Sequence, residues 1–355
     1  MRLRDRFRVC FHEAPAIVGA VCCAALACAS ISCDRNRGAP DWNTPGGTVA
    51  LVGETSGPAA AAPPEPAPEP ADSEAAAAPG GSKGLRFISY NVENWLAMDR
   101  VVNRKTLKNS PKPDSEKQAV VAILARNAPD ILGLCEIGEA RDLAEIQSSL
   151  KAAGLDLPHS HYTGGADPVR HLGLLSRFPI TSTAKPAETE FRLNGQTFGI
   201  NRGILDATIQ TRGKSYRFLG VHLKSKREIE EADQEQMRVH EARLLRRHVD
   251  SILLADPQAR LIVYGDFNDT YPSTTVRTIT GGADKDLRLK PIYLRDSRKH
   301  AWTHHWNHQD IYSRIDFITL APGMDREVNF RASRIIDDPD WDKASDHRPL
   351  LAVFK

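Results

Sequence analysis

Apolar, strand-like runs in this sequence repeatedly end in a carboxylate, an amide or an imidazole. The residues at these ends are Asn91, Glu136, His222, Asp266 with Asn268, Asp316, and Asp346 with His347. A buried strand that ends in a reactive side chain holds that side chain rigidly at the edge of a sheet. The set offers carboxylate and amide oxygens and two imidazoles, without the paired Cys and His spacing of a structural zinc site. Such a set suits a hard cation, Mg²⁺ or Mn²⁺.

Any one of these residues could be an ordinary solvated strand end, so the elements that would position them matter. Apolar patterning predicts strands at 85–92, 131–135, 171–176, 203–211, 216–222, 261–264, 315–320 and 350–354. Helical periodicity predicts helices at 115–127, with Ser115 as a cap, at 139–153 and at 227–254. The buried stripe of the last helix would include Met237, Leu244 and Val249. Strands mixed with helices and with hairpin-like strand pairs indicate an α/β domain whose sheet is not strictly parallel.

The strand ends lie within motifs that resemble those of the endonuclease/exonuclease/phosphatase superfamily. This group includes pancreatic deoxyribonuclease, abasic-site endonucleases, neutral sphingomyelinases and inositol-phosphate phosphatases. In chain order the motifs are Tyr90-Asn91-Val92-Glu93-Asn94, Leu134-Cys135-Glu136, Leu174-Leu175-Ser176-Arg177-Phe178-Pro179, Gly220-Val221-His222-Leu223-Lys224-Ser225, Gly265-Asp266-Phe267-Asn268, Arg314-Ile315-Asp316-Phe317 and Ser345-Asp346-His347-Arg348-Pro349. The resemblance covers residues 85–355. It implies a four-layer α/β/β/α sandwich of two mainly antiparallel sheets flanked by helices, with the active site at one edge of the sheets.

The resemblance also implies a metal site. Glu136 would be the principal ligand, with Asn91 and Asp346 completing the coordination directly or through water. The cofactor expected is Mg²⁺, with Mn²⁺ as the alternative. Glu93 stands where several relatives have a shorter acid or another residue, and it is a candidate for supporting the ligands from behind.

The remaining motif residues would carry out the chemistry. By resemblance, Asp266 would orient and deprotonate an attacking water, and Asn268 would hold the same phosphate. His347 would bind a phosphoryl oxygen, with Asp316 fixing its tautomer and orientation. His222 would be a second imidazole on the phosphate, either as a hydrogen-bond donor or as an acid for the leaving oxygen.

The implied activity is hydrolysis of phosphodiester bonds by in-line attack of water, in a divalent-metal-dependent phosphoric ester hydrolase. A nuclease outside the cytoplasm, acting on DNA or RNA, is favoured. A sphingomyelinase-like phospholipid esterase or an esterase of small phosphate esters is the alternative. The His222-Leu223-Lys224-Ser225 context is closer to deoxyribonucleases and sphingomyelinases than to abasic-site enzymes. A catalytically silent binding module of this fold is disfavoured, because such modules typically lose the Glu, the Asp-x-Asn pair or the terminal His present here.

Three further groups of residues are weighed outside the motifs. The segment 300–308 contains His300, His304, His305 and His308 with Trp302 and Trp306. We expect a surface loop there, with substrate contact or a zinc site as alternatives. Arg170 and Lys224 are candidates for phosphate contact. Basic residues of the helix 227–254, among them Arg238 and Arg246, are expected on a solvated face, because acidic residues interrupt them.

The first 83 residues are expected to be an export signal followed by a tether. Four arginines precede an uncharged, Ala-rich run from 14 to 33, which is typical of an export signal. The run ends in Ser30-Ile31-Ser32-Cys33, which resembles a bacterial lipoprotein cleavage box, and Cys28 is the other candidate for the lipidated cysteine. An uncleaved signal anchor and an ordinary cleaved signal are the alternatives to lipidation. The Ala/Pro/Glu-rich residues 34–83 predict a disordered tether, leaving 84–355 as the phosphoesterase domain.

Whole-chain composition adds little to this assignment. The formal net charge is +2 over 355 residues, which by itself indicates neither a nucleic-acid nor a membrane partner. Five of the six cysteines lie in the predicted leader, and Cys135 is expected to be a small buried apolar residue. We therefore expect a monomer exported to the cell envelope and anchored by lipid at Cys33, or else a periplasmic or secreted protein.

Overall fold

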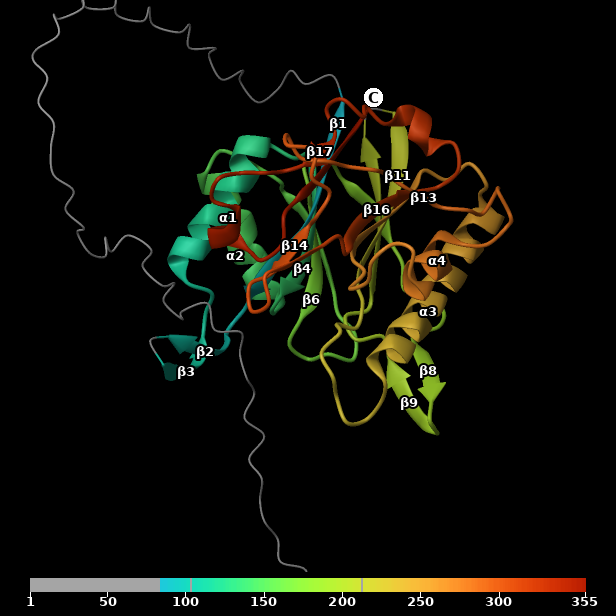
Figure 1. Ribbon diagram of the computed structural model, residues 1–355. Coiled ribbons are helices and arrows are strands. Elements are labelled where there is room, and N and C mark those ends of the chain that lie inside the picture. The colour runs from blue at the N-terminus through green and yellow to red at the C-terminus, as the bar shows by residue number, and fades with distance from the viewer. Residues whose placement is uncertain (1–83, 103, 212) are drawn as a thin grey trace, which may run out of the picture.

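Two six-stranded sheets form the centre of the molecule in a computed structural model that describes residues 84–102, 104–211 and 213–355 (Figure 1). The predicted export signal and tether lie outside these described residues. The first sheet runs in the order β17 (Arg334–Ile335), β18 (Leu350–Phe354), β1 (Leu85–Trp95), β4 (Ile131–Ile137), β6 (His171–Ser176) and β5 (His159–Thr163). The second runs in the order β13 (Lys290–Pro291), β16 (Asp316–Leu320), β12 (Leu261–Asp266), β11 (Lys214–His222), β10 (Ile204–Thr211) and β7 (Ile180–Thr183).

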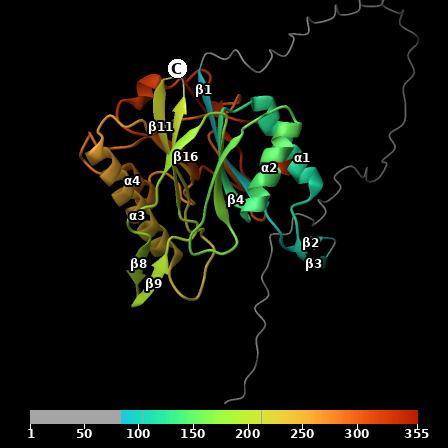
Figure 2. The ribbon, with the colours of Figure 1, turned by 180° about the vertical axis from the view of Figure 1, so that it is seen from behind.

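Helices cover the outer faces of both sheets, as the views from the front and from behind show (Figures 1 and 2). The first sheet is covered by α1 (Asp114–Asn127) and α2 (Ala140–Ala152), and the second by α3 (Gln234–Ala255) and α4 (Thr274–Thr280). Neighbouring strands are antiparallel except for β1 with β4 and β11 with β12, which are parallel. The predicted fold, a four-layer sandwich of two mainly antiparallel sheets, is confirmed.

Short hairpins extend this sandwich. They are β2 (Met98–Val102) with β3 (Lys105–Ser110), β8 (Glu190–Leu193) with β9 (Gln196–Gly199), and β14 (His304–Trp306) with β15 (Ile311–Ser313). A 3₁₀ turn, η1 (Met324–Glu327), and the one-turn helix α5 (Trp341–Ala344) complete the elements. Within the described residues, no helix combines the length and the apolar character needed to cross a membrane.

Aromatic rings fill the space between the two sheets. Phe87 of β1 lies 4.9 Å, between ring centroids, from both Phe218 of β11 and Tyr264 of β12. Two glycines leave room for the tyrosine, because a Cβ on Gly133 would lie 2.1 Å from Tyr264 Cε2 and one on Gly220 would lie 2.6 Å from its hydroxyl. Gly133 faces the ring from the opposite sheet and Gly220 lies beside it in the same sheet, so the close approach of the two sheets depends on Gly133 having no side chain.

The observed helices differ from the predicted ones at their first residues. Ser115 is not a cap, since α1 begins at Asp114 after Pro113 and has no side-chain cap. The helix predicted at 227–254 begins only at Gln234, where the Asp233 side chain accepts a hydrogen bond from the backbone N–H of Gln236. Its predicted stripe of Met237, Leu244 and Val249 is buried as expected, as is the free thiol of Cys135.

The prediction that the basic residues of this helix are solvated is wrong for two of them. Arg238 and Arg246 are buried, with 4% and 9% of their surfaces exposed. Arg238 donates to the backbone carbonyl of Lys224, and Arg246 donates to Asp250 and to the carbonyls of Ile279 and Leu287. Both guanidinium groups therefore tie loops to the helix, since a buried cation must find acceptors inside the protein.

Candidate active site

The first sheet brings two of the predicted site residues, and the second brings three, to the same edge. In the first sheet, β1 and β4 are parallel, so Asn91 and Glu136 emerge together. In the second, β11 and β12 are parallel and their last residues, His222 and Asp266, are register partners. Asp316, the first residue of antiparallel β16, pairs with Asp266 from the other side. Five residues that are far apart in the sequence thus meet where the two sheets face each other.

The amide of Asn91 joins the two halves of this cluster. Its Nδ2 lies 3.2 Å from Glu136 Oε1, 3.2 Å from Asp266 Oδ2 and 3.3 Å from His347 Nε2. Its Oδ1 accepts a hydrogen bond from the backbone N–H of Glu93. Because the nitrogen faces the carboxylates, the amide must turn over before its oxygen can bind a cation.

Irregular backbone points these side chains inward. The register of β1 with β4 shifts between Asn91 and Trp95, and the register of β4 with β6 shifts across Glu136. Glu93, Asn94, Glu136 and Asn268 all have φ between 49° and 65°, in the left-handed region. Non-glycine residues in this region are uncommon and gather at functional sites, where surrounding contacts hold them.

Glu136 is held in the ionised state. Its Oε2 accepts a hydrogen bond of 2.9 Å from the backbone N–H of Asn94, whose side chain also receives the Nε–H of Arg170. Burial raises the pKa of Glu136, but His222, Arg170, His347 and the Asn91 amide outweigh it and lower the pKa to about 2. An imidazole contributes only when protonated, and the pKa of His222 is lowered whereas that of His347 is raised, so at neutral pH Arg170, His347 and the amide carry the effect. The predicted principal ligand is a carboxylate ready to bind a cation.

His347 is oriented by a buried carboxylate. Its Nδ1 lies 2.8 Å from Asp316 Oδ2, and its Nε2 lies 3.7 Å from Asp266 Oδ2. Burial lowers the pKa of His347, but Asp316 and Asp266 outweigh that effect and raise it well above its ordinary value. The Nδ1–H therefore points at Asp316, and Nε2 is presented to the site, which is the arrangement the resemblance implies.

The pKa shifts of Asp266 and His222 both favour the neutral form, whereas those of Glu136 and His347 favour the charged form. Burial and the neighbouring Asp316 raise the pKa of Asp266 to about 7. Burial and the Arg202 guanidinium lower the pKa of His222 well below its ordinary value, so this imidazole is neutral at pH 7. His222 Nε2 lies 3.5 Å from Asp266 Oδ2, and its Nδ1 has no hydrogen-bond partner among the described residues. Asn268 lies beside them, donating from Nδ2 to Asp266 Oδ2 and to the carbonyl of Leu223.

Asp346 completes the set from the loop before β18. Its backbone N–H donates to Glu93 Oε2, so Glu93 supports a predicted ligand from behind. Its Oδ1 is buried and has no hydrogen-bond partner among the described residues. A carboxylate oxygen left unpaired at a buried position is costly unless a cation completes it. The oxygen-rich donor set of Glu136, Asp346 and the Asn91 amide therefore fits a hard divalent cation.

Two candidates for phosphate contact separate in the structure. Arg170 lies beside Glu136 through Asn94, whereas Lys224 is buried and turns its Nζ toward the carbonyls of Ser225 and Arg227, away from the cluster. Arg202 was not singled out in the sequence. It is buried near His222, where its Nε lies 3.3 Å from Asp167 Oδ2.

The expectation of a surface loop at 300–308 is wrong for His304. This residue opens β14, forms a bridge with His347, and places its ring 4.6 Å from that of His347. Burial, with a smaller contribution from His347, lowers the pKa of His304 to about 4. In contrast, Trp306 and His308 are exposed as expected. A short strand with no apolar alternation carries little sequence signal, which explains why His304 was not assigned to the site.

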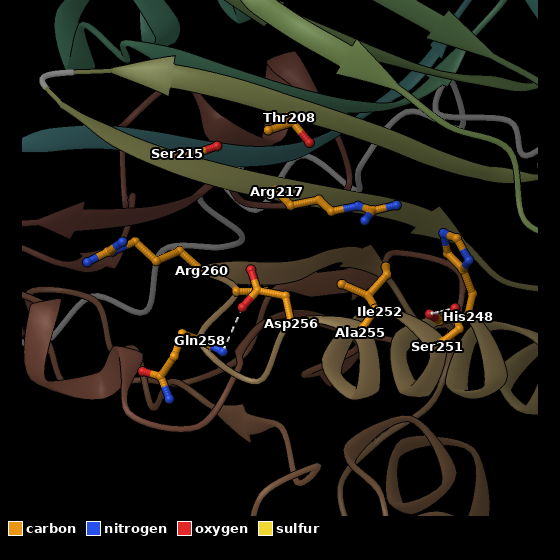
Figure 3. Close-up of a pocket in the computed structure, with 11 residues that line it drawn as sticks. Thr208, Ser215, Arg217, His248, Ser251, Ile252, Ala255, Asp256, Gln258 and Arg260 are labelled. Atoms are coloured by element: carbon orange, nitrogen blue, oxygen red, sulfur yellow. Dashed lines mark hydrogen bonds between the residues drawn. The ribbon is translucent and has the colours of Figure 1, made fainter.

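A cavity of about 410 Å³ lies at the other end of the second sheet, between the start of β11 and the end of α3 (Figure 3). Its basic groups are already paired, Arg217 and His248 with Asp206 and Arg260 with Glu327. These charged groups are thus already paired within the protein, whereas His222 Nδ1 and Asp346 Oδ1 at the strand ends have no hydrogen-bond partner among the described residues.

Comparisons with known proteins agree with this geometry. The profile described as "Endonuclease/Exonuclease/phosphatase family" matches residues 90–314, more than half of the chain. No curated protein sequence matches significantly.

Solved structures share the fold at low identity. The catalytic domain of human Nocturnin with bound sulfate has a TM-score of 0.54 and 19% identity, covering 77% of this chain and 94% of that one. Sphingomyelinase C from Streptomyces griseocarneus has a TM-score of 0.52 and 14% identity, covering 77% and 100%. A Staphylococcus aureus beta toxin mutant with bound magnesium ions has a TM-score of 0.52 and 13% identity, covering 77% and 100%. At such identities these neighbours establish the fold alone.

Proposed function

We propose that this chain, which belongs to the endonuclease/exonuclease/phosphatase family, is a divalent-metal-dependent phosphodiesterase that hydrolyses nucleic acid outside the cytoplasm. The observation that carries the proposal is the contact of one amide, Asn91, with Glu136, Asp266 and His347. The residues proposed as cation ligand, base and phosphate-binding imidazole each lie within 3.3 Å of the same amide nitrogen. That is the machinery required for attack of water on a phosphate ester.

The residues divide the reaction between the two sheets. Glu136 and Asp346, with the oxygen of Asn91, would hold a cation that neutralises phosphate charge. Asp266 would accept the proton of the attacking water, and Asn268 would hold the phosphate beside it. His347 would donate from Nε2 to a phosphoryl oxygen while Asp316 holds Nδ1–H. Water adds opposite the leaving oxygen, and the bond between phosphorus and that oxygen breaks without a covalent enzyme intermediate.

The charge state of His222 supports one of its two sequence-based roles. A neutral imidazole has one N–H, which can donate a hydrogen bond to a phosphate oxygen. It has no second proton to release, so it is a poor acid for the leaving group. Since burial lowers the pKa of His222, we assign it the role of donor.

A basic hairpin beside the site favours nucleic acid as the substrate. The segment 98–112, which contains β2 and β3, has five basic residues against one acidic residue. Arg100 donates to the carbonyl of Asn94, and Lys112 donates to that of Glu93, so the hairpin is rooted at the site. Lys112 is paired with Glu116 and Lys108 with Asp99, so phosphates on either side of the cleaved bond would gain chiefly from the exposed Arg104 and Lys105.

A second candidate, a phospholipid esterase, is favoured by a different hairpin. Trp306, Ile311 and Tyr312 on β14 and β15 are 40% to 50% exposed. This hairpin is joined to the site by the bridge between His304 and His347. Exposed aromatic side chains of this kind suit a membrane interface as well as a base.

One assay separates these substrates. The full-length protein in detergent would be given plasmid DNA, RNA, sphingomyelin and bis(p-nitrophenyl) phosphate, each with Mg²⁺, Mn²⁺ or EDTA. Metal-dependent cleavage of nucleic acid supports the proposal, and cleavage of sphingomyelin alone replaces the substrate. If the folded protein hydrolyses none of these esters, the enzyme assignment is contradicted.

For the location, we propose export with lipid attachment at Cys33, which predicts that Cys33→Ser releases the protein from membranes.

A further inference from the structure

Three potential metal-binding side chains, those of His304, Asp346 and His347, form a cluster that does not include Glu136. His304 Nε2 lies 3.8 Å from Asp346 Oδ2, and His347 Nε2 lies 3.9 Å from Asp346 Oδ1. One donor atom from each of the three residues lies within 4.8 Å of the others. Each oxygen of a single carboxylate thus faces its own imidazole.

Both imidazoles are already turned to present the same nitrogen. Asp316 Oδ2 lies 2.8 Å from His347 Nδ1, and Ser313 Oγ lies 3.3 Å from His304 Nδ1. Histidines that bind a metal usually contact it through one ring nitrogen while the other is hydrogen-bonded to a carboxylate, carbonyl or water. The orienting contacts are therefore present on both rings.

The backbone fixes the relative positions of the three residues. His304 and His347 form a β-bridge, and the backbone N–H of His305 donates to the carbonyl of Asp346 over 2.9 Å. These contacts join the β14–β15 hairpin to the loop that carries Asp346. The donor atoms are held together by main chain, so little ordering remains to be done when an ion binds.

Asp346, which would also be a ligand of the first cation, has an Oδ1 that is buried and lacks a hydrogen-bond partner among the described residues. Metal–ligand bonds of about 2.0–2.1 Å in tetrahedral geometry separate donors by roughly 3.3 Å. The observed 3.8 and 3.9 Å exceed that by about half an ångström, a movement that small side-chain rotations supply.

We propose that His304, Asp346 and His347 form a second metal site, selective for a borderline ion such as Zn²⁺. Two nitrogen donors and one carboxylate, with an open fourth position, suit Zn²⁺ far better than Mg²⁺. The site shares Asp346 and His347 with the machinery assigned above. An ion bound there occupies the Nε2 of His347 that would contact the phosphate, so Zn²⁺ inhibits hydrolysis in the presence of Mg²⁺.

Metal binding itself tests this site without relying on the proposed activity. The full-length protein, His304→Phe and His308→Ala would be titrated with Zn²⁺ in saturating Mg²⁺ by equilibrium dialysis, and with Co²⁺ by visible absorption. Phenylalanine keeps a ring beside His347 but has no ligand nitrogen, and exposed His308 is the matched control. Thermal unfolding in Mg²⁺ identifies any variant that fails to fold.

We expect one Zn²⁺ per chain and the intense absorption of four-coordinate Co²⁺ in the wild type and in His308→Ala. In His304→Phe the Zn²⁺ dissociation constant rises by more than the roughly 10- to 100-fold that loss of an outer partner costs. Where hydrolysis is measurable, the Zn²⁺ concentration for half inhibition rises in parallel. Equal Zn²⁺ affinity in all three proteins, or no Zn²⁺ bound by the folded wild type, overturns the site.

Discussion

Replacing Asp316 by Asn tests whether the Asp316–His347 contact serves catalysis or only stability. The two side chains meet at 2.8 Å, with about 6% and 5% of their surfaces exposed. A hydrogen bond to a charged group contributes about 1.5–3 kcal/mol. If that contribution is lost from the transition state, kcat falls by roughly 10- to 150-fold, at about 1.4 kcal/mol per tenfold. The loss is larger if the new amide fixes the wrong tautomer of His347.

A control with a similar imidazole contact exists on the face of the second sheet that α3 covers. Asp206 Oδ2 also lies 2.8 Å from an imidazole nitrogen, that of His248, and Asp206 is equally buried. Asp206→Asn therefore changes a buried carboxylate that contacts the His248 imidazole and Arg217 and that is not one of the predicted site residues. Both variants should lose stability to urea, but only Asp316→Asn should lose turnover.

The assay is metal-dependent hydrolysis of bis(p-nitrophenyl) phosphate, with Mg²⁺ affinity measured separately by calorimetry. We expect kcat to fall in Asp316→Asn while Mg²⁺ affinity changes by less than a few-fold, since Asp316 is not among the proposed ligands. If kcat is unchanged, or if Asp206→Asn loses as much activity as Asp316→Asn, the orienting role of Asp316 is refuted.

Three further predictions follow from the same contacts. Glu136→Ala should lower Mg²⁺ affinity and activity together, whereas His347→Ala should abolish turnover with Mg²⁺ still bound. Calorimetry measures the Mg²⁺ affinity and the hydrolysis assay measures the turnover. Equal loss of Mg²⁺ binding in both variants would contradict the division of roles. Burial and Asp316 raise the pKa of Asp266 to about 7, and a base must be ionised to accept a proton, so kcat/KM should increase with pH along an acid limb. A bound cation moves that limb below pH 7. A profile that is flat from pH 5 to 8 would argue against Asp266 as the base. Gly133→Ala places a Cβ 2.1 Å from Tyr264 Cε2, so overpacking should cost about 1–3 kcal/mol in urea unfolding. Adding Tyr264→Leu should restore part of that stability, and Gly282→Ala, at an open position without a positive φ, should show no such loss.

The strand ends could be predicted from the sequence because their signals are local. Asn91 and Asp266 each follow an apolar run that could only be a buried strand, and the ordered motifs placed their neighbours. The same runs predicted a mixed α/β domain, and the resemblance carried by the motifs implied the four-layer sandwich. What the sequence could not show is which face of Asn91 points at the carboxylates, because that depends on contacts with β4, β12 and the loop before β18.

The positions of His304 and Arg246 inside the protein could not be predicted from the sequence, and the physical reason is the same for both. Their burial depends on partners distant in sequence: His347 for the histidine, and the carbonyls of Ile279 and Leu287 for the arginine. A residue's own type gives a prior for exposure, and polar residues are usually exposed. Only the tertiary structure shows where acceptors are available to overturn that prior.

The position of the site is a consequence of sheet topology. In an antiparallel pair, one strand begins where its neighbour ends, so two successive strand ends lie at opposite edges of the sheet. Among the described strands, each sheet contains one parallel pair, β1 with β4 and β11 with β12. Each parallel pair brings two carboxyl ends to one edge, and packing face to face brings the two edges together. Glu136 and Asp266 are thus set apart by the same inter-sheet spacing that Gly133 and Tyr264 define. A substitution that forces the sheets apart should therefore lower catalysis as well as stability, although it touches no residue of the site.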